Sequence, residues 1–139
     1  MHPLPGRTRR PRPDFALTNH TRGLVCREFV EFEPLARHSK SGMPLTKEFR
    51  LFFLDARPFW WTRYWEEGDY GGLTPPLSRF MGLARAVSSH FFTMDVAKRM
   101  DGDWMVVELG DGQVAGLPDN AAVGGFYQAL IAHWRGGPG

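Results

Sequence analysis

The chain has 139 residues, 42% of them hydrophobic and 23% charged, a mix typical of one globular domain and not of a disordered or fibrous protein. No window approaches the roughly 18 to 20 uncharged apolar residues that cross a bilayer. The opening segment MHPLPGRTRRPRPDF lacks the apolar core of a signal peptide, so we expect a cytoplasmic protein. A single cysteine, Cys26, excludes an internal disulfide, a zinc finger and a CxxC redox site.

The formal net charge of +2 is unevenly distributed along the chain. Residues 1–22 hold five arginines against one aspartate, which leaves 12 basic and 14 acidic residues in 23–139. The first segment is rich in arginine and proline and poor in apolar groups, so we expect a disordered tail over 1–22, a folded domain over 23–135 and a frayed end at 136–139. The tail could bind nucleic acid electrostatically, but the acidic body argues against nucleic acid as the main partner.

Hydrophobic periodicity and turn residues predict strands separated by loops, followed by helices. In chain order we expect a strand at 23–33, a loop at 34–44, and a hairpin of strands 47–55 and 58–65 that turns at Ala56-Arg57. A loop at 66–76, a helix at 77–87, a hairpin of strands 91–96 and 104–109 that turns at 101–103, and a helix at 120–135 complete the order.

Short turns between consecutive strands imply an antiparallel sheet, and the two amphipathic helices can cover one of its faces. The predicted fold class is therefore α+β. The aromatic run in the 58–65 strand serves as packing or as a stacking platform for sugars or bases. Strict alternation would place Phe59, Trp61 and Trp65 on one face and Trp60 and Tyr64 on the other.

Two carboxylates mark the candidate site. Asp95 lies near the middle of one predicted strand and Glu108 near the end of the next, so a turn at 101–103 should place them opposite each other. Like charges in such positions repel unless they are neutralised, and hard oxygen ligands suit Mg²⁺ together with phosphate oxygens. The alternative is a solvated sheet face on which Arg50 or Lys98 pairs with the carboxylates.

The phrases REFVEF, KEFRLFF, DVAKRMDGDW and VVELGDGQVAGLP, within residues 23–132, resemble the C-terminal, metal-binding part of ATP-grasp proteins, most closely a compact bacterial and phage group. In that pattern a glutamate follows an aspartate by 13 residues, the spacing of Asp95 and Glu108 here. The pattern normally continues with an asparagine two residues later as a further metal ligand. This chain has Gly110 there, followed by Asp111 and Gln113.

The resemblance implies roles for individual residues. Backbone groups of Glu28 and Val30 would contact the adenine edge, and Phe29 and Val30 would line the base pocket. Glu48 would hold the ribose, and Arg50 would face the phosphates or the acyl substrate as the catalytic residue. The implied metal ligands are Asp95, Glu108 and Asp111.

The function implied by the resemblance is ATP-dependent carboxylate–amine ligation, with ATP and Mg²⁺ as cofactors and a carboxylate and an amine as substrates. ATP-grasp folds hold ATP between two lobes, and the phosphate-gripping lysines of the preceding lobe are missing here. We therefore expect a chain that needs a second lobe or subunit to act as an enzyme. The alternative is a noncatalytic binding or interaction module that keeps the fold of the lobe.

Overall fold

The structure, a computed structural model, describes residues 26–117 and 122–136. The predicted tail at 1–22 and most of the predicted frayed end at 136–139 lie outside these ranges. The strands are β1 (Pro34–Arg37), β2 (Pro44–Thr46), β3 (Glu48–Leu54), β4 (Arg57–Arg63), β5 (Phe91–Lys98) and β6 (Trp104–Asp111), and the helices are α1 (Leu77–Ala84) and α2 (Val123–Arg135). Within the described residues, no helix is long and apolar enough to cross a membrane.

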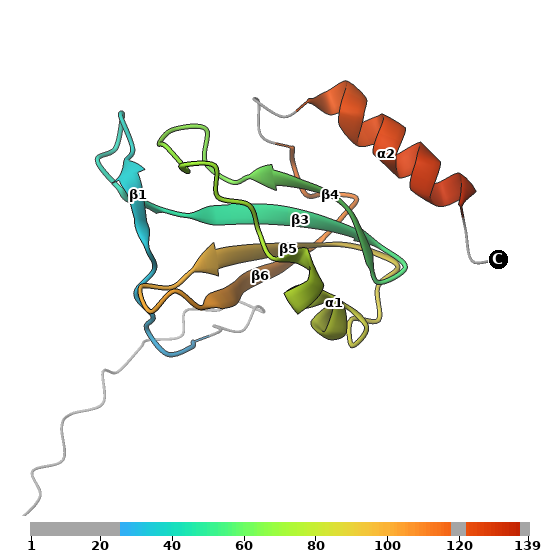
Figure 1. Cartoon of the computed structure of the whole chain (residues 1–139), viewed down its shortest axis with the longest axis horizontal. Coiled ribbons are helices and arrows are strands. Elements are labelled where there is room, and N and C mark those ends of the chain that lie inside the picture. The colour runs from blue at the N-terminus through green and yellow to red at the C-terminus, as the bar shows by residue number, and fades with distance from the viewer. Residues whose placement is uncertain (1–25, 118–121, 137–139) are drawn as a thin grey trace, which may run out of the picture.

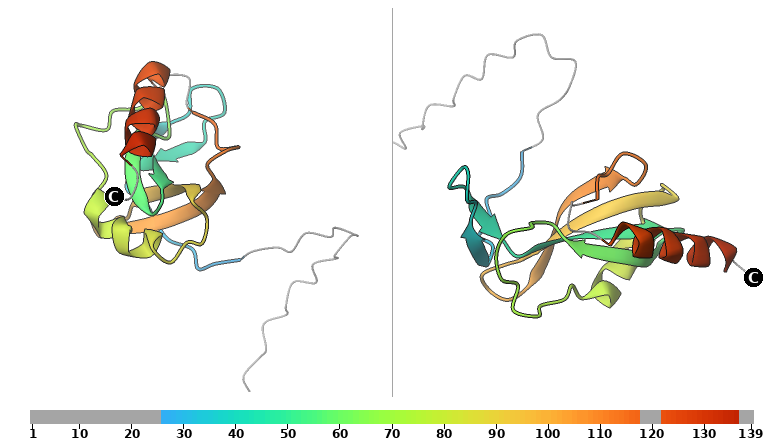
Figure 2. Two further views of the ribbon diagram at one scale, coloured as in Figure 1. Left: turned by 90° about the vertical axis from the view of Figure 1, so that its right-hand side faces the viewer. Right: turned by 90° about the horizontal axis from the view of Figure 1, so that it is seen from above.

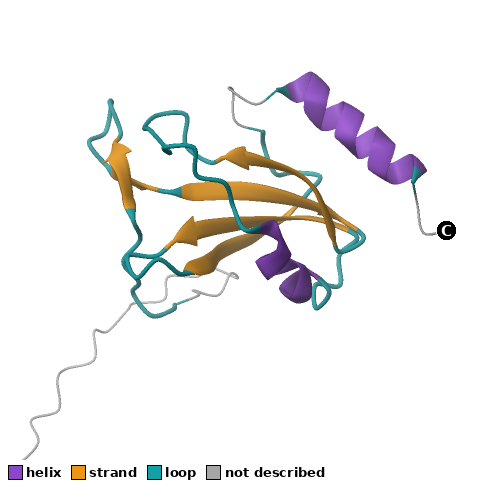
Figure 3. Ribbon diagram, viewed as in Figure 1, coloured by secondary structure: helices purple, strands orange, loops and turns teal. Residues whose placement is uncertain are grey.

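The four long strands form one antiparallel sheet in the order β4-β3-β5-β6, and β1 and β2 form a separate two-stranded ribbon (Figures 1 and 3). The α+β class predicted from the sequence is confirmed. The first hairpin turns at Asp55 and Ala56, one residue earlier than expected, and both residues have positive φ, 49° and 60°. Two consecutive left-handed residues match the twist of a two-residue hairpin loop, which fixes the register of β3 against β4.

The segment before β1 differs most from the prediction. In place of a strand at 23–33, the described residues 26–33 contain an isolated bridge between Phe32 and Arg99, and strands β1 and β2 occupy part of the expected loop at 34–44. Both edges of β5 are taken by β3 and β6, so this segment bonds only beyond the end of β5, where Glu33 N–H donates to Lys98 O at 2.8 Å. The Glu33 carboxylate adds ion pairs with Lys47 and Lys98.

One face of the sheet carries the main core. Alternate residues of the two central strands are fully buried there against Phe80 and Ala84 of α1 and Tyr70 of the preceding loop. The central strands contribute Phe49, Leu51, Phe53, Phe92, Met94 and Val96. A single helix therefore covers this face, because the narrow apolar stripe of α1 is matched by the inward-facing residues of β3 and β5.

The other helix packs on the opposite face, at the β4 edge and away from α1 (Figures 1 and 2). Its anchor is Phe126, 6% exposed, whose ring lies 5.0 Å from Phe52, 5.6 Å from Phe59 and 6.2 Å from Trp60 between centroids. The prediction placed both helices on one face. The two faces each need a cover because β3 is buried at almost every position, so apolar residues point both ways.

A bulge in β4 explains why Phe59 lies beside Trp60. Phe52 pairs with Trp60 and Phe53 pairs with Pro58, so Phe59 is an extra residue that interrupts the alternation. Trp61 keeps its predicted place and contacts Phe49 in the main core, with ring centroids 5.6 Å apart. The bulge thus gives α2 a third aromatic partner and leaves the rest of this face, toward the start of β3, to polar side chains.

Candidate functional site

The polar half of the second face is built by register. Arg50 of β3 pairs with Asp95 of β5, and Asp95 pairs with Glu108 of β6. The predicted apposition of Asp95 and Glu108 is therefore confirmed, and a bulge follows immediately, between Asp95 and Val96. Glu48 lies two residues before Arg50 and shares its face. Three carboxylates and one guanidinium thus gather on adjacent strands.

Asp95 and Arg50 form a closed ion pair. Asp95 is 2% exposed, and its two oxygens accept from Arg50 Nε and Nη2, each at 2.8 Å. A third guanidinium nitrogen, Nη1, donates to Gly116 O at 3.0 Å, and the guanidinium lies 5.1 Å from the centre of the Tyr64 ring. Pairing with Arg50 was the alternative considered from the sequence, but the pair is buried and not solvated. Bonding to Asp95 raises the pKa of Arg50.

Glu48 is the most perturbed acid of the site. It is 9% exposed, and burial, with the Asp95 and Glu108 charges, raises its pKa from 4.5 to about 7, although Arg50 acts in the opposite direction. The Trp65 indole also lowers this pKa, yet its buried Nε1 makes no hydrogen bond of ordinary geometry within the described residues. The indole N–H therefore approaches the carboxylate without satisfying it, and Glu48 is close to half protonated near neutral pH.

The third predicted metal ligand is not brought to this face. Asp111 pairs with Phe92, three residues beyond Glu108, so alternation directs it to the opposite face. Its carboxylate accepts from the backbone N–H of Gln113 at 2.9 Å. Gly110 does share the face of Glu108, but a Cβ there would lie 2.6 Å from Thr93 Oγ1. Thr93 is 1% exposed, so a side chain at position 110 needs the strands to shift.

The residues predicted to contact adenine lie elsewhere. Glu28, Phe29 and Val30 line a pocket of about 500 Å³ together with Arg99, Met100 and Met105, beside the turn between β5 and β6. Phe29 is 86% exposed. This pocket shares no lining residue with the one that contains Arg50. The structure thus separates the predicted adenine residues from the predicted catalytic arginine into two pockets.

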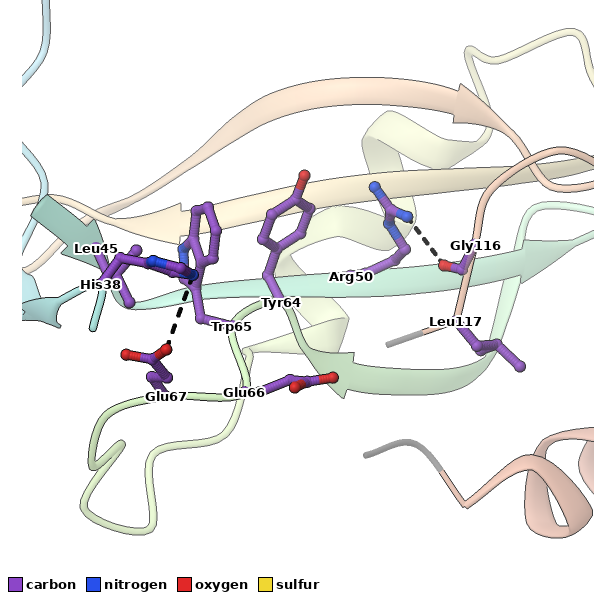
Figure 4. Close-up of a pocket in the computed structure, with 9 residues that line it drawn as sticks. All are labelled: His38, Leu45, Arg50, Tyr64, Trp65, Glu66, Glu67, Gly116 and Leu117. Carbon is purple, nitrogen blue, oxygen red and sulfur yellow. Dashed lines mark hydrogen bonds and ion pairs between the residues drawn. The ribbon is translucent and has the colours of Figure 1, made fainter. Parts of the chain in front are cut away.

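A second pocket, of about 470 Å³, opens beside Arg50 (Figure 4). It is lined by His38, Leu45, Arg50, Tyr64, Trp65, Glu66, Glu67, Gly116 and Leu117. We predicted only packing or stacking roles for the two aromatic residues, and the glutamates were part of an expected loop. The signal that could have found them is position, because Tyr64 to Glu67 follow the end of β4, where the chain leaves the sheet.

Comparison with known protein families matches residues 7–130 to a family of ATP-grasp domains, the third family of its clade. The chain belongs to this ATP-grasp family. No curated protein sequence matches it. The resemblance read from the sequence is thereby confirmed at the level of the superfamily.

The donor set of this ATP-grasp chain can be compared with what Mg²⁺ requires. No group of three or more His, Cys, Asp or Glu side chains suited to a metal occurs among residues 26–117 and 122–136. Mg²⁺ needs only one or two carboxylates when phosphate oxygens and water complete its shell. Asp95 and Glu108 fit that requirement, with Glu108 the more accessible because Arg50 already binds both oxygens of Asp95.

Proposed function

We propose that this ATP-grasp chain binds ATP with Mg²⁺ on the polar half of the second sheet face. The observation that carries the proposal is the placement of Glu48, Asp95 and Glu108 beside one arginine, in a chain of an ATP-grasp family. Three carboxylates against one guanidinium leave an excess of negative charge that a divalent cation would neutralise. The cation would in turn allow polyphosphate to approach an acidic surface.

Each residue then has a role. Glu108 and Asp95 would hold the magnesium ion, which supplies charge neutralisation to the phosphates when bound. Arg50 would orient Asp95 and meet a phosphate with its remaining donors, and Glu48 would accept from the ribose hydroxyls. Asp111, on the opposite alternation of β6, is left out of this set.

The adenine would lie against the pocket at Glu28, Phe29 and Val30. Backbone groups of Glu28 and Val30 are suited to its polar edge, and the exposed Phe29 ring is suited to its apolar face. This assignment requires a nucleotide extended between the two pockets.

The reaction class that follows is carboxylate–amine ligation. A carboxylate oxygen attacks the γ-phosphorus of ATP and ADP leaves; the amine nitrogen then attacks the acyl carbon, and phosphate and a proton leave. We propose that a second lobe or subunit completes the phosphate-binding side. A noncatalytic binding module is the second candidate, and it is favoured by the closed Arg50–Asp95 pair, which competes with a metal for the same oxygens.

The test is titration of Mg·ATP by calorimetry into wild type and Glu108→Gln. Loss of this carboxylate should weaken Mg·ATP binding at least about tenfold. Asp111→Asn is the matched control, because it neutralises a carboxylate of the same strand that lies on the other alternation. Asp95→Asn is less informative, since it leaves a buried guanidinium without its charge partner.

Equal affinity of wild type and Glu108→Gln would refute the metal assignment. Absence of Mg·ATP binding by the folded wild-type chain would favour the noncatalytic module. Circular dichroism of each variant confirms that the sheet is intact in either case.

A further inference from the structure

The pocket beside Arg50 has a chemistry of its own. Arg50 is its only lining residue among those proposed for nucleotide and metal. Figure 4 shows Arg50 and Gly116 at one end, His38 and Glu67 at the other, and Tyr64 and Trp65 between them. Its volume of about 470 Å³ lies within the range typical of small-molecule sites.

The walls of the pocket are aromatic. The Tyr64 and Trp65 rings meet edge to face with centroids 4.9 Å apart. Both side chains are only partly buried, although neighbouring aromatic residues of β3 and β4 pack inside the protein. Ring faces of this kind favour apolar bodies and cationic groups.

The charge of the pocket is negative. Its one guanidinium, on Arg50, is matched by Asp95, which leaves the carboxylates of Glu66 and Glu67 in excess within the lining. Glu67 is held in place because its oxygens accept from Ser39 N at 2.7 Å and Ser39 Oγ at 2.6 Å. Glu66 lies between the two ends of the pocket and has no bond to the other residues drawn in Figure 4.

We infer that this pocket binds a small molecule carrying a primary ammonium group, with Glu66 as its charge partner and Trp65 as the surface for its apolar body. An anion is disfavoured because the only guanidinium of the lining already donates to Asp95 and Gly116. The identification of this ligand as the amine substrate rests on the proposed ligase function. The binding itself does not.

The experiment compares 2-phenylethylamine with 2-phenylethanol, which has nearly the same shape but no charge. Each is titrated into the full chain while two-dimensional NMR follows the indole N–H of Trp65, assigned with Trp65→Phe. The amine should bind about tenfold more tightly than the alcohol. Glu66→Gln should weaken the amine about three- to five-fold and leave the alcohol unchanged, because a solvent-accessible charge pair contributes modestly.

The matched control is Glu31→Gln, which removes a carboxylate from the other pocket. It should leave amine binding unchanged. Equal affinity for amine and alcohol, absence of amine binding, or an unaltered affinity in Glu66→Gln would each overturn the inference. Mg·ATP titration of the same samples separates the two proposals: Glu108→Gln should affect only Mg·ATP and Glu66→Gln only the amine, so either result stands if the other fails.

Discussion

Replacement of Glu48 by glutamine should change how the stability of the protein depends on pH. The pKa of Glu48 rises from 4.5 to about 7 on folding, so the folded state holds a proton that the unfolded state releases. The stabilisation is fully present below about pH 4.5 and is lost as the pH rises through 7. At about 1.4 kcal/mol for each tenfold change in proton affinity, the loss between pH 5 and pH 8 is about 2 to 3 kcal/mol.

The assay is urea unfolding of wild type and Glu48→Gln at pH 5 and pH 8. Glutamine cannot ionise, so the variant should gain on wild type by about 2 to 3 kcal/mol between the two pH values. Glu66→Gln, which alters a carboxylate outside the buried set, serves as the control and should follow wild type. Parallel pH profiles for wild type and Glu48→Gln would refute the reasoning, because they would mean that burial and the two neighbouring carboxylates do not perturb Glu48.

Three further substitutions test the packing around the site. Asp95→Asn should cost about 3 kcal/mol in urea unfolding, and Arg50→Met in the same chain should recover much of it, because it removes the unpaired buried cation; additive costs would contradict this. Gly110→Ala should cost about 1 to 3 kcal/mol, and less in a Thr93→Ala background, where the clashing hydroxyl is absent; equal costs in both backgrounds would exclude the clash. Phe126→Ala should release α2, seen as faster amide exchange in that helix with the sheet unchanged, since Phe126 is its buried anchor; uniform exchange throughout the chain would contradict local release.

The hairpin that carries Asp95 and Glu108 was predictable from the sequence. The Asp101-Gly102-Asp103 turn is local, and Gly102 adopts a φ of 86° that glycine tolerates without strain. Once the turn is fixed, alternation and antiparallel pairing place the two carboxylates opposite each other. Short-range chemistry was sufficient here because no distant contact competes with it.

The segment before β1 and the placement of α2 were not predictable in the same way. Residues 26–33 have a strand-like pattern, but pairing needs a vacant sheet edge, and both edges of β5 are occupied. The β4 bulge moves Phe59 to the face of Trp60, and this extra aromatic residue helps to hold α2 opposite α1. Both outcomes depend on contacts between residues far apart in the chain.

The sequence by itself determined the α+β class, the two hairpins, the apposition of Asp95 and Glu108 and the resemblance to ATP-grasp proteins, because these follow from turn residues, period-two alternation and local motifs. Only the tertiary structure decided that Arg50 binds both oxygens of Asp95, that burial raises the pKa of Glu48, and that a second pocket lies beside the arginine. Burial and charge pairing are properties of the assembled sheet, in which strands distant in sequence exclude water together.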